Sequence, residues 1–154
     1  MVVAVGIDLC EVARVRRALS GPSGPRFRQR VFTEAEQAYC DARGRGRVAS
    51  YAARFAAKEA VAKALGTGFS GGVTWCDVEV VRRADLAPEL VLHGGAARLA
   101  RRRRIAAWHL SLAHTATMAA AVAVAETAPV SGAPLPAHSR AGAPASAPRP
   151  RRRR

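Results

Sequence analysis

The most informative stretch of this sequence is residues 54–68, which read Arg-Phe-Ala-Ala-Lys-Glu-Ala-Val-Ala-Lys-Ala-Leu-Gly-Thr-Gly. Alanine, the strongest helix former, is the commonest residue in it, and the alanine-rich run continues back to about Val48. Gly66 and Gly68 follow the last apolar residue, Leu65, and glycine commonly stands just beyond the end of a helix. The pattern predicts one long helix over residues 48–65.

Both lysines of the chain lie within this predicted helix. Of the 25 basic residues all but Lys58 and Lys63 are arginine. Lysine is a compact point charge that binds phosphate differently from the planar arginine fork, so its confinement to one helix favours an anion-binding role. The simpler alternative is chance clustering on a solvated face. Glu59 lies four residues before Lys63, and a helix ion pair contributing about 0.2–0.5 kcal/mol would explain that spacing by itself.

A strand and a helix are predicted at the N-terminus. Residues 2–7 form a short apolar run rich in β-branched side chains, which is typical of a strand buried on both faces. Asp8 and Glu11 have the spacing of a capping box, with aspartate in place of serine or threonine. They predict a helix over residues 9–19, in which the simplest role of Asp8 is the N-cap. The apolar residues at helical spacing are Val12, Val15 and Leu19.

Asp8 and Glu59 together indicate more than a cap and an ion pair. Asp8 follows a strand at the place where ligands commonly sit in mixed sheets, and Glu59 projects from a helix that could pack across that sheet. Two carboxylates on rigid elements, close to Lys63, suit a Mg²⁺ ion held partly by protein and partly by substrate phosphates. The residues therefore predict a phosphate-bearing ligand bound together with magnesium.

The rest of the chain mixes helices and strands, which predicts the α+β class. Thr33 and Glu36 form a second capping box, and the short helix that it starts ends by Gly44. Further strands are predicted over residues 73–81, 89–93, 108–113 and 118–124, with a helix over residues 96–104. His114 stands at the end of the third of these strands, where a half-buried structural histidine explains it as well as a ligand does.

Composition and charge exclude several classes of protein. The formal net charge is +14, but residues 127–154 hold six arginines and no acid, which leaves +8 on residues 1–126. No apolar run approaches the roughly 20 residues that cross a bilayer, and the N-terminus lacks the basic region of a signal peptide. The three cysteines form no metal-type pair. We expect a cytoplasmic protein with free thiols, one folded domain over residues 1–126, and a disordered tail rich in Pro, Ala and Arg over residues 127–154.

The motifs resemble those of the holo-acyl-carrier-protein synthases, the small 4′-phosphopantetheinyl transferases. Residues 54–68 are similar to the central signature of that family nearly throughout, and Gly6-Ile-Asp-Leu-Cys-Glu-Val-Ala-Arg14 resembles its N-terminal motif. Phe32-Thr-Glu-Ala-Glu36 and Ser111-Leu-Ala-His114 match further landmarks in order and spacing. The resemblance covers residues 1 to about 126. It implies a small antiparallel or mixed sheet wrapped by a long central helix, in a homotrimer with active sites between protomers.

The resemblance also implies an activity. Enzymes of this family transfer 4′-phosphopantetheine from coenzyme A to a serine of apo-acyl carrier protein, release adenosine 3′,5′-bisphosphate and need Mg²⁺. The carrier protein serves fatty-acid or polyketide synthesis. By their place in the motifs, Asp8 and Glu59 would bind the metal and Lys63 would contact the diphosphate. Because the serine nucleophile belongs to the carrier protein, Glu59 is also the candidate base, acting through a water.

Two further sets of residues follow from the same resemblance. The family binds the rest of coenzyme A at positions that here are Arg45, Arg54, Gly66, Thr67, Gly68 and His114, with the 3′-phosphate end held by Arg45, Arg54 and His114. It docks the acidic carrier protein at positions that here are Arg14, Arg26, Phe27 and Arg30, and we expect Phe27 to be exposed as an interface anchor. One departure is Ala113, since the family usually has a hydroxyl residue before the histidine.

Two other interpretations remain. The net positive charge and the runs Arg101–Arg104 and Arg151–Arg154 would suit a nucleic-acid-binding domain, although aromatic residues are few and no known reader motif is present. The second alternative is a non-catalytic domain that binds carrier protein. Such a domain would not need Asp8, Glu59 and Lys63 together. Because phosphoryl transfer depends mostly on positioning and charge stabilisation, these three residues favour the transferase.

Overall fold

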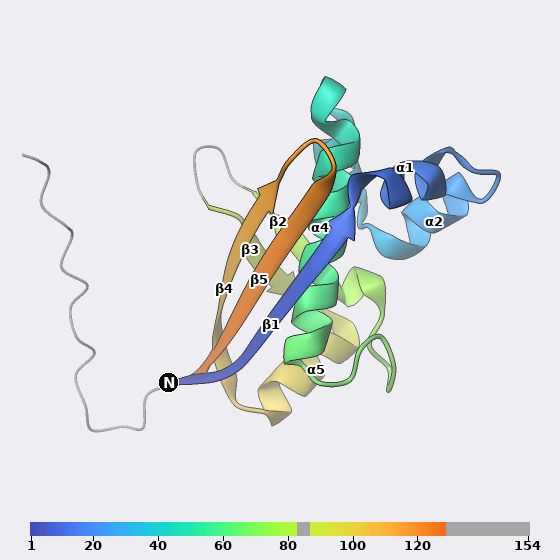
Figure 1. Ribbon diagram of the computed structural model, residues 1–154. Helices are drawn as coiled ribbons and strands as arrows, with labels where there is room; N and C mark the ends of the chain where they lie inside the picture. Colours follow the sequence, from blue (N-terminus) through green and yellow to red (C-terminus); the bar gives the residue numbers. More distant parts are fainter. Residues whose placement is uncertain (83–86, 129–154) are drawn as a thin grey trace, which may run out of the picture.

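Helix α4 (Arg47–Ala64) packs along one face of a three-stranded sheet (Figure 1). It begins and ends one residue earlier than the sequence predicts. The sheet is antiparallel, and its strands stand in the order β1 (Val2–Glu11), β5 (Met118–Thr127) and β4 (Ile105–His114). The computed structural model describes residues 1–82 and 87–128, so the expected tail lies outside the described residues from residue 129 onward.

The remaining elements complete an α+β fold, as predicted. Helices α1 and α2 lie together beyond the end of β1 (Figure 1), and β2 and β3 form a second, two-stranded antiparallel sheet. The bounds are α1 (Val12–Ser20), α2 (Gly24–Val31), α3 (Glu34–Asp41), β2 (Val78–Val81), β3 (Glu89–Leu92) and α5 (Gly94–Arg102), with 3₁₀ turns at Gly44–Gly46 and Trp75–Asp77. Among the described residues, no helix has the length and apolar character needed to cross a bilayer.

Within one chain, strand β1 is buried on one face only, and not on both faces as predicted. Gly6 and Cys10 face α4 and are buried. A side chain at Gly6 would overlap the carbonyl oxygen of Ala60, and glycine therefore allows the close approach of β1 to α4. The opposite face of β1 carries apolar side chains that are 44–63% exposed, namely Val3, Val5, Ile7 and Leu9.

The predicted capping box of Asp8 and Glu11 is absent. Asp8 lies inside β1, and antiparallel pairing with β5 holds the backbone extended as far as Glu11, opposite Met118. Helix α1 begins only at Val12, and Glu11 at its N-cap position makes no side-chain capping hydrogen bond. Local spacing predicted a cap, but the ladder hydrogen bonds of the sheet decide where the helix can start. Asp8 is therefore available for another role.

The second capping box is confirmed, and its glutamate also enters the core. Thr33 Oγ1 accepts a hydrogen bond from the Glu36 backbone N–H (3.3 Å), and the Thr33 N–H donates to Glu36 Oε2 (2.9 Å). Glu36 is buried, forms an ion pair with Lys58 Nζ (2.8 Å) and accepts from the backbone N–H of Val80 (2.9 Å). This carboxylate links α3, α4 and β2.

Lys58 is a structural cation, which corrects its expected anion-binding role. Its side chain is fully buried, pairs with Glu36, and donates to the carbonyl oxygens of Trp75 (3.0 Å) and Val78. These partners use all three of its donors. Of the two lysines, only Lys63 can meet a ligand.

The C-terminal strands pair as predicted, whereas the predicted strand over residues 73–81 is shorter. Strands β4 and β5 join through a turn at residues 115–117 and extend beyond their predicted ends. Only Val78–Val81 forms a strand, because the 3₁₀ turn at Trp75–Asp77 precedes it. Helix α2 was not predicted, although Pro25 in its first turn is a common start signal.

Candidate active site

Asp8 of β1 and Lys63 of α4 meet where the strand crosses the last turns of the helix. Lys63 Nζ lies 2.7 Å from Asp8 Oδ1 and donates to the carbonyl oxygen of Ile7 (3.0 Å). The Asp8 side chain is 15% exposed, whereas that of Lys63 is 55% exposed, so the ammonium group can reach a ligand in solution. Two elements that are far apart in sequence thus bring together the predicted carboxylate and lysine.

Glu59 belongs to the same cluster. It lies one helical turn before Lys63 and is half-buried. Burial is the main cause that raises the pKa of Glu59 above its ordinary value, and the negative charge of Asp8 raises it further. The positive charges of Lys63 and Arg14 oppose this increase. Two carboxylates close enough to repel one another would be stabilised by a cation between them.

The donor set of this cluster fits magnesium better than a metal that needs an all-protein cage. Within residues 1–82 and 87–128, no group of three or more His, Cys, Asp or Glu side chains could hold a metal ion. Mg²⁺ commonly takes one or two carboxylates and completes its shell with waters and substrate phosphates. Asp8 and Glu59 supply that minimal set, and Lys63 beside them suits a phosphate ligand.

The raised pKa of Glu59 predicts that its charge destabilises the metal-free protein. Because this pKa is higher in the folded chain than in the unfolded chain, ionisation of Glu59 opposes folding at neutral pH and has no effect when both states are protonated. Glu59→Gln should therefore increase the free energy of unfolding at pH 7 in EDTA. The increase should shrink as the pH falls from the raised pKa of folded Glu59 toward the reference value of 4.5, and it should be absent well below that value. Urea unfolding at pH 7 and at a pH well below 4.5 measures this change in the free energy of unfolding.

Glu11→Gln is the control for this experiment, because Glu11 is an exposed glutamate at the end of β1. It should leave the free energy of unfolding unchanged at both pH values. A Glu59→Gln protein that is no more stable than wild type at pH 7 would contradict the predicted destabilisation by the buried Glu59 charge.

Arg45, Arg54 and His114 form a second cluster, near the start of α4 and the tip of β4. Two adjacent hollows share His114. One has a volume of about 590 Å³ and is also lined by Arg45, and the other has a volume of about 260 Å³ and is also lined by Arg54. Arg54 is 4% exposed, while Arg45 and His114 are exposed. The three residues expected at the 3′-phosphate thus line two hollows that share His114.

The two clusters lie on different sides of α4. Arg54 and Lys63 are nine residues apart in one helix. At about 100° and 1.5 Å per residue, this spacing places their side chains on roughly opposite sides and about 13 Å apart along the axis. One chain therefore does not gather all the predicted coenzyme A residues around one position.

The glycine segment after α4 lies at the Lys63 end of the helix. Gly66 and Gly68 have φ angles of 66° and 56°, a backbone conformation that residues with a side chain rarely adopt. Thr67 Oγ1 donates a hydrogen bond to the carbonyl oxygen of Gly68 (3.1 Å). The guanidinium of Arg103 packs over Gly66, since a Cβ at Gly66 would lie 3.3 Å from Arg103 Nη1. Arg103, which belongs to the arginine run at the C-terminal end of α5, was not predicted to lie there.

The residues expected to dock the carrier protein lie on α1 and α2. Arg14 is exposed, and its Cζ stands 5.4 Å from the centre of the Phe55 ring. Arg14 also influences the pKa of Glu59, so α1 borders the carboxylate cluster. Arg26 and Arg30 are exposed on α2.

Phe27 differs from its prediction. It is half-buried, and its ring centre lies 6.0 Å from that of Phe32 and 6.4 Å from that of Phe55. Most of its surface therefore packs against the core instead of standing free among the arginines. The exposed part of the α1 and α2 surface is mainly arginine.

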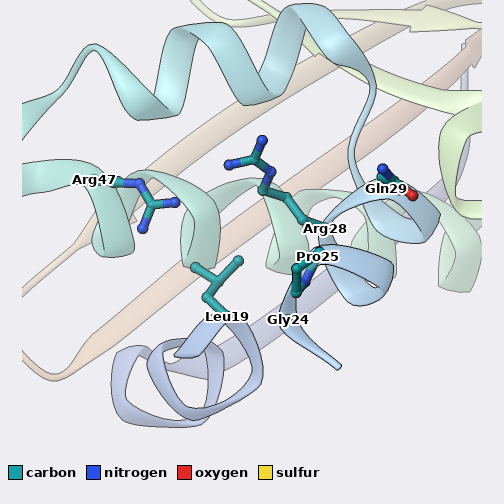
Figure 2. A pocket seen from close by; sticks show the side chains of 6 residues that line it. All are labelled: Leu19, Gly24, Pro25, Arg28, Gln29 and Arg47. Carbon is teal, nitrogen blue, oxygen red and sulfur yellow. The ribbon is translucent and has the colours of Figure 1, made fainter. Parts of the chain in front are cut away.

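A further hollow, of about 220 Å³, lies between α1, α2 and the start of α4 (Figure 2). Arg28 and Arg47 extend toward it from α2 and α4, and Leu19 lines it from α1 (Figure 2). Both arginines already pair with Asp41, at 3.1 Å and 2.7 Å. Their charges are thus partly neutralised, whereas no ion pair within the described residues involves Arg45 or Arg54 beside His114.

Comparison with known proteins points to one family. Residues 4–125 match the model of the 4′-phosphopantetheinyl transferase superfamily. A holo-[acyl-carrier-protein] synthase of Anaeromyxobacter dehalogenans is 52% identical over 128 residues, which cover 82% of this chain and 97% of that protein. The crystal structure of the Neisseria meningitidis holo-[acyl-carrier-protein] synthase has a TM-score of 0.74 at 31% identity, over 82% of this chain and 100% of the other. The Bacillus anthracis enzyme, solved in complex with coenzyme A (3′,5′-ADP), has a TM-score of 0.68 at 32% identity, over 83% and 99% of the two chains.

Proposed function

Because this chain belongs to the 4′-phosphopantetheinyl transferase superfamily and is a holo-[acyl-carrier-protein] synthase, we propose that it modifies a serine of apo-acyl carrier protein in a Mg²⁺-dependent reaction. The donor is coenzyme A, the products are holo-acyl carrier protein and adenosine 3′,5′-bisphosphate, and the carrier serves fatty-acid or polyketide synthesis. The convergence of Asp8, Glu59 and Lys63 is the observation that carries this proposal.

Each residue of the cluster has a distinct task in the proposed reaction. Asp8 and Glu59 would hold Mg²⁺, which supplies positive charge to the diphosphate and lowers the barrier to displacement at phosphorus. Lys63, the exposed cation of the cluster, contacts the diphosphate from the helix side. Glu59 is also the candidate base for the proton of the carrier serine, acting through a water.

A single incubation tests the function. The protein is mixed with coenzyme A, MgCl₂ and an apo-acyl carrier protein, and the carrier is weighed by mass spectrometry. The expected result is a gain of one phosphopantetheine group, with release of adenosine 3′,5′-bisphosphate and no gain in EDTA. A carrier that keeps its mass in magnesium buffer would refute the proposal. Carrier proteins of fatty-acid and polyketide synthesis, compared side by side, identify the preferred substrate.

A homotrimer with active sites between protomers is part of the same proposal. Two observations support it. The outward face of β1 exposes Val3, Val5, Ile7 and Leu9, and the register places Val5 opposite Val124 and Ile7 opposite Val122 of β5. Contiguous apolar patches of this kind mark interfaces. In addition, the Arg54 and Lys63 clusters lie on different sides of α4, so a neighbouring chain would have to complete each site.

Val5→Glu should therefore break the assembly and the activity together. A buried, unpaired carboxylate in an apolar interface is strongly unfavourable. Light scattering after size exclusion should show a mass of three times 16.2 kDa for the wild type and 16.2 kDa for the variant. Val91→Glu, at an exposed apolar position on β3, is the matched control and should remain trimeric. A trimeric Val5→Glu protein would place the interface elsewhere.

Carrier-protein docking is proposed to be electrostatic, through Arg14, Arg26 and Arg30 around the half-buried Phe27. Arg14→Glu should raise the KM for carrier protein about tenfold or more at low salt, while the KM for coenzyme A changes less, because charge reversal slows association with an acidic partner. The difference should fade as salt is added. Initial rates over a carrier titration measure it. An unchanged carrier KM at low salt would show that the carrier docks on another surface.

A further inference from the structure

The hollow beside His114 contains a buried arginine without an acidic partner. Arg54 is 4% exposed, and within the described residues it forms no ion pair and its Nε atom has no hydrogen-bond partner. A buried charge that is left uncompensated is costly, so this guanidinium is poised for an anion that the described part of the chain does not supply. The other basic residues that line the hollow are Arg43, Arg82 and His114.

An aromatic ring accounts for the position of Arg54. Its Cζ lies 4.0 Å from the centre of the Tyr39 ring, which is the shortest cation–ring distance in the described part of the chain. Arg43 stands against the same ring, with its Cζ 5.7 Å from the centre. Tyr39 belongs to α3 and is half-buried, so the core holds the ring while both guanidinium groups rest on it.

Contact with an aromatic ring suits a guanidinium that must stay free to bind. A carboxylate partner would take the N–H donors of an arginine, whereas a ring face stabilises the cation and leaves its in-plane donors unused. Two guanidinium groups brought to one ring also repel one another. A doubly charged phosphate monoester between them would relieve that repulsion and accept their donors.

We propose that Tyr39 is a positioning residue that holds Arg54 and Arg43 as a paired clamp for the terminal phosphate monoester of the nucleotide. This inference rests on the proposed function, because it takes coenzyme A as the ligand. It adds two residues, Tyr39 and Arg43, to the set expected from the sequence. It also predicts that Tyr39 affects only ligands that carry the 3′-phosphate.

Two ligand pairs isolate that phosphate. Coenzyme A is compared with 3′-dephospho-coenzyme A in the transfer assay, and adenosine 3′,5′-bisphosphate is compared with adenosine 5′-monophosphate by calorimetry. In wild type, the ligands with the 3′-phosphate should bind more tightly. Tyr39→Leu should raise the KM for coenzyme A and the Kd for the bisphosphate about tenfold, with kcat and the constants for the ligands without the 3′-phosphate nearly unchanged. Tyr39→Phe keeps the ring face and should keep the wild-type discrimination.

Controls separate positioning from a general loss of structure. Trp108→Leu removes another half-buried ring, on β4, that does not line the hollow, and it should not change the preference for the 3′-phosphate. If Tyr39→Leu does not fold, Arg43→Ala carries the test, because Arg43 is exposed and its loss should weaken only the ligands with the 3′-phosphate.

Each remaining outcome has one meaning. If Tyr39→Leu weakens both members of each pair equally, or neither, the clamp is refuted and Tyr39 is structural. If wild type does not distinguish the members of a pair, the hollow does not bind the phosphate and the clamp is refuted, while transfer to the carrier protein still supports the proposed function. If wild type transfers nothing, the proposed function fails, and the calorimetric comparison decides the clamp independently.

Discussion

Asp8→Ala is expected to reduce transfer at least a thousandfold in magnesium buffer without unfolding the protein, and Glu59→Ala is expected to do the same. Groups that stabilise developing charge at a transferred phosphorus commonly contribute this much to the rate. For Asp8→Ala the loss of stability should be small, because the ion pair between Asp8 and Lys63 is partly exposed and such pairs are worth about 0–1 kcal/mol. Transfer rates and urea unfolding measure the two effects on the same preparations.

The control for these variants is Glu11→Ala. Glu11 lies at the end of the same strand as Asp8 but is exposed and lacks a place in the cluster. It should retain wild-type transfer, within about threefold, since surface substitutions away from a site are usually nearly neutral. Near-wild-type transfer by Asp8→Ala or Glu59→Ala would remove the basis for a magnesium site at this cluster.

Lys58→Ala is expected to lower the free energy of unfolding by about 3–5 kcal/mol, because it leaves the Glu36 carboxylate buried and unpaired. Glu36 and Lys58 are both fully buried and 2.8 Å apart, and Lys58 also satisfies the carbonyl oxygens of Trp75 and Val78. Such a loss is a large part of the total stability of a small domain. Urea unfolding and the yield of folded protein measure it.

Lys63→Ala provides the contrast within the same helix. It should lose transfer activity while its free energy of unfolding changes by about 1 kcal/mol or less, because its side chain is 55% exposed. A Lys58→Ala protein with wild-type stability and weakened coenzyme A binding would reverse the assignment and return Lys58 to the ligand site.

The sequence by itself determined the features that depend on neighbouring residues. The alanine-rich run over residues 48–65 predicted α4 to within one residue at each end, and Thr33 with Glu36 predicted the start of α3. Both signals act within one or two turns, so the sequence carries them whatever the rest of the chain does. The pairing of a strand-end aspartate with Glu59 and Lys63 was predicted because each residue type suits a magnesium–phosphate site.

Only the tertiary structure decided what depends on distant contacts. Asp8 had the spacing of a helix cap, but the ladder with β5 keeps it in a strand beside Lys63. Lys58 and Lys63 look alike in sequence, yet packing against Glu36 buries the first and leaves the second exposed. Tyr39 carried no sequence signal, because its contact with Arg54 joins residues of two different helices. Local propensity cannot encode such contacts, since residues far apart in the chain supply each partner.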